Sequence, residues 1–146
     1  MNRIAISENF FLDEFIPPEI YTARGSQSIQ LLDMRIIMGV QKLRELANVP
    51  FTVNNWARGG RFKERGLRSA NTTTGARWSQ HKYGRAVDID PQGITIAQLF
   101  AILKANEKWF IERSFITTVE NISATPSWLH VDCRYTGQDS LLIVNP

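Results

Sequence analysis

The stretch SQHKYGRAVDID, residues 79–90, limits the possible folds more than any other part of the sequence. Its second half alternates in the manner of a strand, so Val87 and Ile89 form an apolar face while Asp88 lies on the opposite face. A glycine precedes this segment and a proline follows it, as expected for an element bounded by tight turns. We therefore expect a buried strand over residues 85–90, with carboxylates on its other face.

A second strand with the same alternation is expected at residues 128–134, WLHVDCR. Its core face is formed by three apolar residues: Leu129, Val131 and Cys133. His130 then lies on the less buried face, beside Asp132. The same alternation makes Cys133 a small core residue rather than a metal ligand.

Helical and extended segments are mixed along the rest of the chain. Apolar residues recur at helical spacing over residues 29–47, and Thr95 with Gln98 forms a capping box at the start of another helix. An aromatic segment at residues 9–15 is expected to dock as a short turn or strand. Further strands are expected at three places: residues 51–55, 115–120 and 141–144. Since there is no strict βαβ alternation, the pattern favours an α+β fold with a mainly antiparallel sheet flanked by helices.

The length of 146 residues favours a single domain over residues 1–146. The formal net charge is +3, and much of the positive excess lies in residues 58–85. Such a basic segment favours anionic partners, such as nucleic acid or an anionic cell-wall polymer, and the alternative is a solvated loop surface without a partner. It contains no recognised nucleic-acid-binding motif, so nucleic acid is not expected as a partner.

The chain holds one cysteine, which excludes an intramolecular disulfide. Its first fifteen residues, MNRIAISENFFLDEF, do not form a signal peptide, because polar and acidic residues interrupt the apolar ones. No stretch approaches the length and hydrophobicity of a membrane span. We therefore expect synthesis in the cytoplasm as a soluble product, with no membrane association.

The two histidines of the chain lie in or next to the two alternating segments. A tight turn at Gly84 would let His81 and Asp88 supply two ligands to one metal ion, and His130 would supply a third from a neighbouring strand. Two imidazoles and one carboxylate form a familiar catalytic zinc set that leaves one position for water. The alternative is that both histidines make ordinary surface or core hydrogen bonds.

A longer motif supports the metal interpretation. The pattern Ser79-x-His81-x-x-Gly84-x-Ala86-x-Asp88, followed by Trp128-x-His130, resembles the zinc-dependent D-Ala-D-Ala carboxypeptidase and dipeptidase family. These peptidoglycan metallopeptidases share a fold with the Hedgehog signalling domain, and the chain is most similar to short phage- and bacterium-encoded members. The resemblance also covers three upstream segments: residues 9–15, 31–55 and 55–81.

The resemblance implies a role for each motif residue. His81, Asp88 and His130 would bind Zn²⁺. A glutamate shortly before the Trp-x-His motif is the general base in the family, and Glu120 is the matching residue. An arginine after the first strand holds the substrate or the developing oxyanion, and Arg58 is the match. Seven residues separate Glu120 from the tryptophan, which is a longer spacing than the family commonly has.

The implied function is hydrolysis of peptide bonds in peptidoglycan stem peptides, of the D-Ala-D-Ala carboxypeptidase or L-Ala–D-Glu endopeptidase type. A phage-related role in wall lysis or wall penetration is expected, with the protein acting on the cell wall after release, as a monomer or associated with a virion. The alternative is a wall-binding or virion structural protein that keeps the metal but is not catalytic.

Overall fold

The structure is a computed structural model that describes residues 2–146. Within this range five strands form one sheet in the order β1-β2-β4-β3-β5. The strands are β1 (Phe51–Thr52), β2 (Ala86–Pro91), β3 (Thr118–Glu120), β4 (Leu129–Asp132) and β5 (Leu142–Val144). The helices are α1 (Pro18–Arg24), α2 (Met34–Ala47), α3 (Ile96–Ala105) and α4 (Glu107–Glu112).

The sheet is mixed. β2 pairs antiparallel with β1 and with β4, and β3 pairs antiparallel with β4. β5 adds to the edge of β3 in the parallel direction. The chain therefore forms a single α+β domain, as expected, and its sheet is antiparallel except at the β3–β5 edge.

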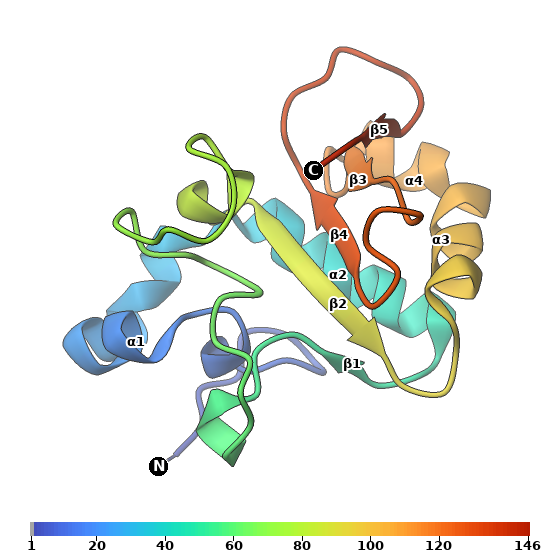
Figure 1. Cartoon of the computed structure of the whole chain (residues 1–146). Coiled ribbons are helices and arrows are strands. Elements are labelled where there is room, and N and C mark those ends of the chain that lie inside the picture. The colour runs from blue at the N-terminus through green and yellow to red at the C-terminus, as the bar shows by residue number, and fades with distance from the viewer. Residues whose placement is uncertain (1) are drawn as a thin grey trace.

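The core lies between the sheet and the helices behind it (Figure 1). Val87 and Ile89 of β2 are opposite Val131 and Leu129 of β4, and all four side chains are buried. α2 and α3 cover this face with apolar side chains at helical spacing: Ile36, Ile37, Val40, Leu43, Leu99 and Leu103. Burying each such side chain contributes roughly 1.5–3 kcal/mol of transfer free energy. This packing fixes the alternation of β2 and β4, and so turns their polar residues to the other face.

The α2 helix begins later than its periodicity predicts. The Asp33 carboxylate accepts a hydrogen bond from the Arg35 amide at 3.0 Å, which caps a helix that starts at Met34. Residues Gly25–Leu31 form a 3₁₀ turn instead. The predicted start at residue 29 is therefore wrong, because a local cap decides the boundary rather than the apolar pattern.

Several other boundaries also differ from the sequence-based prediction. The predicted strand at 51–55 is reduced to the two residues of β1. α1 and α4 have no counterpart in the prediction, although Pro18 stands at the first position of α1, which suits its fixed φ. The capping box at Thr95 and Gln98 is confirmed, with both reciprocal hydrogen bonds formed.

The aromatic segment at residues 9–15 docks into the core. Phe10 and Phe15 are buried and meet edge to face, with ring centroids 5.4 Å apart. Leu12–Glu14 forms a 3₁₀ turn between them. Within residues 2–146, no helix has both the length and the apolar character that crossing a membrane requires.

The polar face of β4 is not the less buried side that the sequence suggests. His130 is 4% exposed and Asp132 is 0% exposed. The Arg134 side chain folds back over Asp132, and the His81 ring packs edge-on against the His130 ring at a centroid distance of 5.0 Å. Tertiary covering by residues outside the strand therefore buries both of its faces.

Candidate metal centre

The turn before β2 places His81. Residues Gln80–Tyr83 form a 3₁₀ turn that Ser79 caps, since its Oγ accepts a hydrogen bond from the His81 amide at 3.3 Å. The turn ends at Gly84 with φ +65°, and a Cβ at this position would lie 2.0 Å from the carbonyl oxygen of Leu31. Only glycine fits such a turn. It directs the chain into β2 with the His81 ring over the polar face of the strand.

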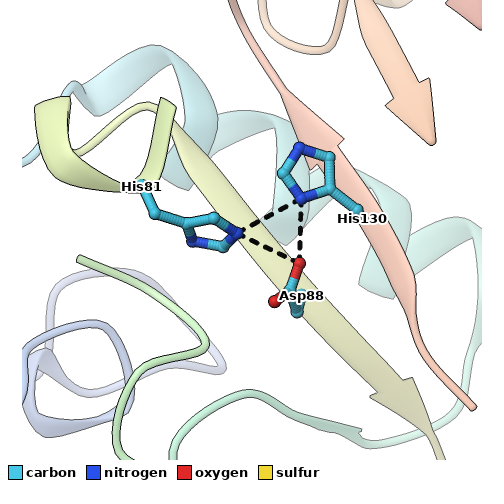
Figure 2. A group of neighbouring side chains, drawn as sticks. All are labelled: His81, Asp88 and His130. Atoms are coloured by element: carbon cyan, nitrogen blue, oxygen red, sulfur yellow. Dashed lines mark hydrogen bonds and ion pairs between the residues drawn. The ribbon is translucent and has the colours of Figure 1, made fainter. Parts of the chain in front are cut away.

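Strand register brings the other two residues together. Asp88 of β2 is directly opposite His130 of β4, so both side chains leave the sheet on the same face. Figure 2 shows the three side chains pointing toward one another from the turn and from the two strands. His81 Nε2 lies 3.2 Å from Asp88 Oδ1 and 3.2 Å from His130 Nδ1, and His130 Nδ1 lies 2.9 Å from Asp88 Oδ1. All three residues are buried.

The outer nitrogen of each imidazole is already engaged. His81 Nδ1 lies 2.7 Å from the carbonyl oxygen of Gly66, and His130 Nε2 lies 3.1 Å from Asp132 Oδ2. A carbonyl and a carboxylate only accept, so both outer nitrogens carry the proton in the neutral rings. The inner nitrogens then present lone pairs to each other and to the Asp88 carboxylate. Three acceptors that converge in a buried space require a cation between them.

The titration of these groups expresses the same requirement. Burial alone would lower the pKa of His130, but hydrogen bonds with Asp132 and Asp88 outweigh burial and raise it to about 9. Burial would raise the pKa of Asp88, yet the two imidazoles hold it well below its usual range. Without a metal, a proton on His130 supplies the positive charge, and a divalent ion would replace it. These three residues, His81, Asp88 and His130, can therefore hold a metal ion, and they are called the metal group below.

Glu120 lies next to this group through the register of the sheet. β4 lies between β2 and β3, and Asp88 of β2 is opposite His130 of β4. Glu120 is the last residue of β3, and on its far edge it is opposite Val144 of β5. The β3–β4 pairing places Glu120 beside His130, with Glu120 Oε1 3.9 Å from His130 Nδ1. The hairpin of residues 121–127 thus leaves Glu120 at the metal group, in agreement with its predicted position.

A cavity of about 560 Å³ opens above these residues. His81, Asp88, His130 and Glu120 all line it. Two tryptophans also line it. Trp128 is the residue before β4, and Trp78 lies in the loop before the turn that carries His81 and is 69% exposed. The metal group is therefore accessible to a ligand through a cavity with apolar and charged walls.

The arginine of this cavity is not the one predicted. Arg58 contributes to a second hollow, where its Nη2 lies 3.8 Å from Glu14 Oε1, and it is not among the residues that line the metal cavity. Arg68 lines that cavity instead, with Nη2 3.1 Å from Asp88 Oδ2. The assignment of Arg58 therefore disagrees with the structure. The sequence carries no distinct signal for Arg68, since its buried neighbour Leu67 is one of several apolar residues in this loop, with Phe62 and Trp78.

The loop around Arg68 is held by side-chain hydrogen bonds. The two carboxylate oxygens of Glu64 accept from the hydroxyls of Thr72 at 2.6 Å and Thr74 at 2.8 Å. Arg68 Nε donates to the Glu64 carbonyl at 2.8 Å. A Cβ on Gly75 would lie 2.6 Å from Arg68 Nη1, so the glycine makes room for the guanidinium.

Arg134 is a second arginine of the cavity that sequence reasoning did not assign to the site. Its Nε donates to Asp132 Oδ1 at 2.8 Å, and Asp132 in turn contacts His130.

Comparison of the chain with protein-family models, curated proteins and solved structures found no match.

Proposed function

We propose that this chain is a zinc-dependent peptidase of the Hedgehog/DD-peptidase fold class that hydrolyses peptide bonds in peptidoglycan stem peptides. The observation that carries the proposal is the convergence of His81, Asp88 and His130 at the floor of a cavity, with Glu120 beside them. The motif that joins these residues resembles that of the peptidoglycan metallopeptidases. The cell wall would be the site of action.

The donor set fits zinc. Two imidazole nitrogens and one carboxylate oxygen are ligands that zinc accepts in tetrahedral sites, and a fourth position would remain open toward the cavity. When bound, zinc would supply Lewis-acid chemistry, polarising the scissile carbonyl and acidifying a water molecule. Asp132 and the Gly66 carbonyl would hold the two imidazoles in the orientation that zinc needs.

Glu120 would act as the proton carrier. Its side chain is 18% exposed and lies at the edge of the metal group, within the cavity. A carboxylate in this position can accept a proton from the attacking water and return it to the leaving amine. Arg68, whose guanidinium is fixed by Glu64 and Asp88, would donate to the oxyanion or to a substrate carboxylate, the role expected of Arg58.

Digestion of purified peptidoglycan by the zinc-loaded protein tests the proposal, with mass analysis of the released fragments identifying the bond that is cut. We expect about one zinc per chain and release of stem-peptide fragments. We expect Glu120→Gln to keep its zinc and to lose about 10²–10⁴-fold in rate, the usual contribution of a general base. The matched control is Glu112→Gln, which removes an exposed acid at the end of α4.

Each result points to a different conclusion. A wild-type protein that takes up no zinc would exclude the metal centre. A protein that holds zinc but releases no fragments would be a binding or structural protein, the alternative considered above. Full activity in Glu120→Gln would move the proton-carrying role to another residue.

A further inference from the structure

Arg134 lines the cavity, and only part of its guanidinium is engaged by the protein. Its Nε and Nη2 donate to the two oxygens of the Asp132 carboxylate, and its backbone amide donates to the same side chain at 3.2 Å. Among residues 2–146, Nη1 has no protein acceptor. The side chain is 33% exposed and lines the cavity. One edge of the guanidinium is thus locked in place, and its other donors are free.

The lock on Arg134 is shared with the metal group. Asp132 is 0% exposed, and its Oδ2 also contacts His130 Nε2 at 3.1 Å. The guanidinium is therefore held in a fixed position relative to His130. Arg134 also lies beside the residue before β3, because its carbonyl accepts a hydrogen bond from Thr117 Oγ1. Arg68, in contrast, reaches the cavity from the β2 side, where it pairs with Asp88.

The chemistry of the free edge indicates what it binds. A guanidinium that is fixed by one carboxylate presents its remaining N–H groups in a planar fork, and this geometry matches a second carboxylate. A neutral amide offers one acceptor oxygen and no charge, so it would bind less well. We propose that Arg134 binds a free carboxylate of the substrate peptide, which rests on the proposed function. Asp132 is the positioning residue that aims it.

Stem peptides carry two carboxylates that can be blocked separately. These are the C-terminal carboxylate of D-Ala and the α-carboxylate of the γ-linked D-Glu. The probes are therefore a lysine-type stem pentapeptide, its C-terminal amide and its D-Glu α-amide. Binding would be measured by calorimetry on zinc-loaded protein carrying Glu120→Gln, so that the peptide is not consumed.

We expect one amidation to weaken binding about 10–100-fold, the usual effect of losing a hydrogen-bonded charge pair. In the Arg134→Gln background the acid and that amide should bind equally. Arg134→Lys, which keeps the charge but not the fork, should fall between the two. The matched control is Arg24→Gln, which removes an exposed arginine on α1 and should leave all three affinities unchanged.

A purely structural role for Arg134 gives a different result. Arg134→Gln would then weaken the acid and both amides by the same factor, or change none of them, and either result would overturn the proposal. So would a failure of all three peptides to bind. Arg134-dependent preference for a carboxylate, in a protein whose wild type does not cut peptidoglycan, would refute the peptidase proposal and leave this one standing.

Discussion

At the scale of single side chains, Asp132 connects two residues of the candidate site, His130 and Arg134. Its fully buried carboxylate contacts His130, holds Arg134 and remains ionised, because burial, which would raise its pKa, is outweighed by hydrogen bonds with these two residues. A carboxylate behind a metal-binding histidine fixes the tautomer and increases the basicity of the ring. Asp132 would therefore support a metal bound by His130 without contacting that metal itself.

We expect Asp132→Asn to lower zinc affinity about 10–100-fold, the usual effect of losing such a partner. The amide still offers an oxygen, but it loses the negative charge that favours proton donation from His130 Nε2. Competition with a chelator would measure the affinity. Asp139→Asn, at an exposed position, should bind zinc as the wild type does. Equal affinities in the two variants would show that Asp132 serves only Arg134.

The convergence of His81, Asp88 and His130 could be predicted from sequence, and the arginines of the cavity could not. Alternation places Asp88 and His130 on the polar faces of their strands, and the pairing of β2 with β4 then brings the two side chains together. Residues 58–85 hold several arginines without any period. Which arginine reaches the cavity depends on loop hydrogen bonds, such as those of Glu64, that have no sequence signature. The resemblance pointed to Arg58 by its place after the first strand, and that place does not fix which arginine reaches the cavity.

At the scale of elements, most differences between prediction and structure come from helix caps and from distant side chains that pack over a strand face. The start of α2 depends on the Asp33 cap. β1 is short because, of the predicted segment 51–55, only Phe51 and Thr52 pair with β2. The Arg134 side chain covers Asp132, and the turn that carries His81 packs its ring against His130. Alternation predicted which residues of β4 share a face. It could not predict that distant segments would cover that face.

The Asp33 cap gives a prediction about pH. A hydrogen bond from the Arg35 side chain, which outweighs burial, holds the pKa of Asp33 below its ordinary value of 3.8. The charge therefore stabilises the fold above pH 3.8, and this contribution is lost as the pH falls through the lower folded-state pKa. Asp33→Asn keeps the capping oxygen and removes the charge.

We expect the wild type to exceed Asp33→Asn by roughly 0.2–1 kcal/mol in free energy of unfolding at neutral pH, the usual value of exposed ion pairs. The difference should close as the solution is acidified below pH 3.8. Urea unfolding at a series of pH values would measure it. A difference that stays constant with pH would assign the effect to the cap geometry instead of the charge.

At the scale of the whole molecule, the metal would couple segments that are far apart in the chain. His81 and His130 are separated by 49 positions, and they meet only when β2 and β4 pair. A ligand that binds the folded state and not the unfolded chain stabilises the fold by mass action. Stability should therefore follow metal occupancy.

Removing the metal should lower the melting temperature. With free zinc at 100 times its dissociation constant, the expected stabilisation is about 2.7 kcal/mol. For a chain of this size that corresponds to a shift of roughly 5–10 °C. Scanning calorimetry with and without a chelator would measure it. His81→Ala should show no zinc-dependent shift, and a wild type whose melting temperature ignores zinc would contradict the metal centre.

The loop pinned by Glu64 has a consequence for the entropy of binding. A cavity wall made of a long loop normally has to become ordered when a ligand arrives, and the lost freedom weakens the complex. Here Thr72, Thr74 and Arg68 are tied to Glu64 by three hydrogen bonds in the free protein. The wall is thus preorganised, and most of the contact energy with a ligand can appear as affinity.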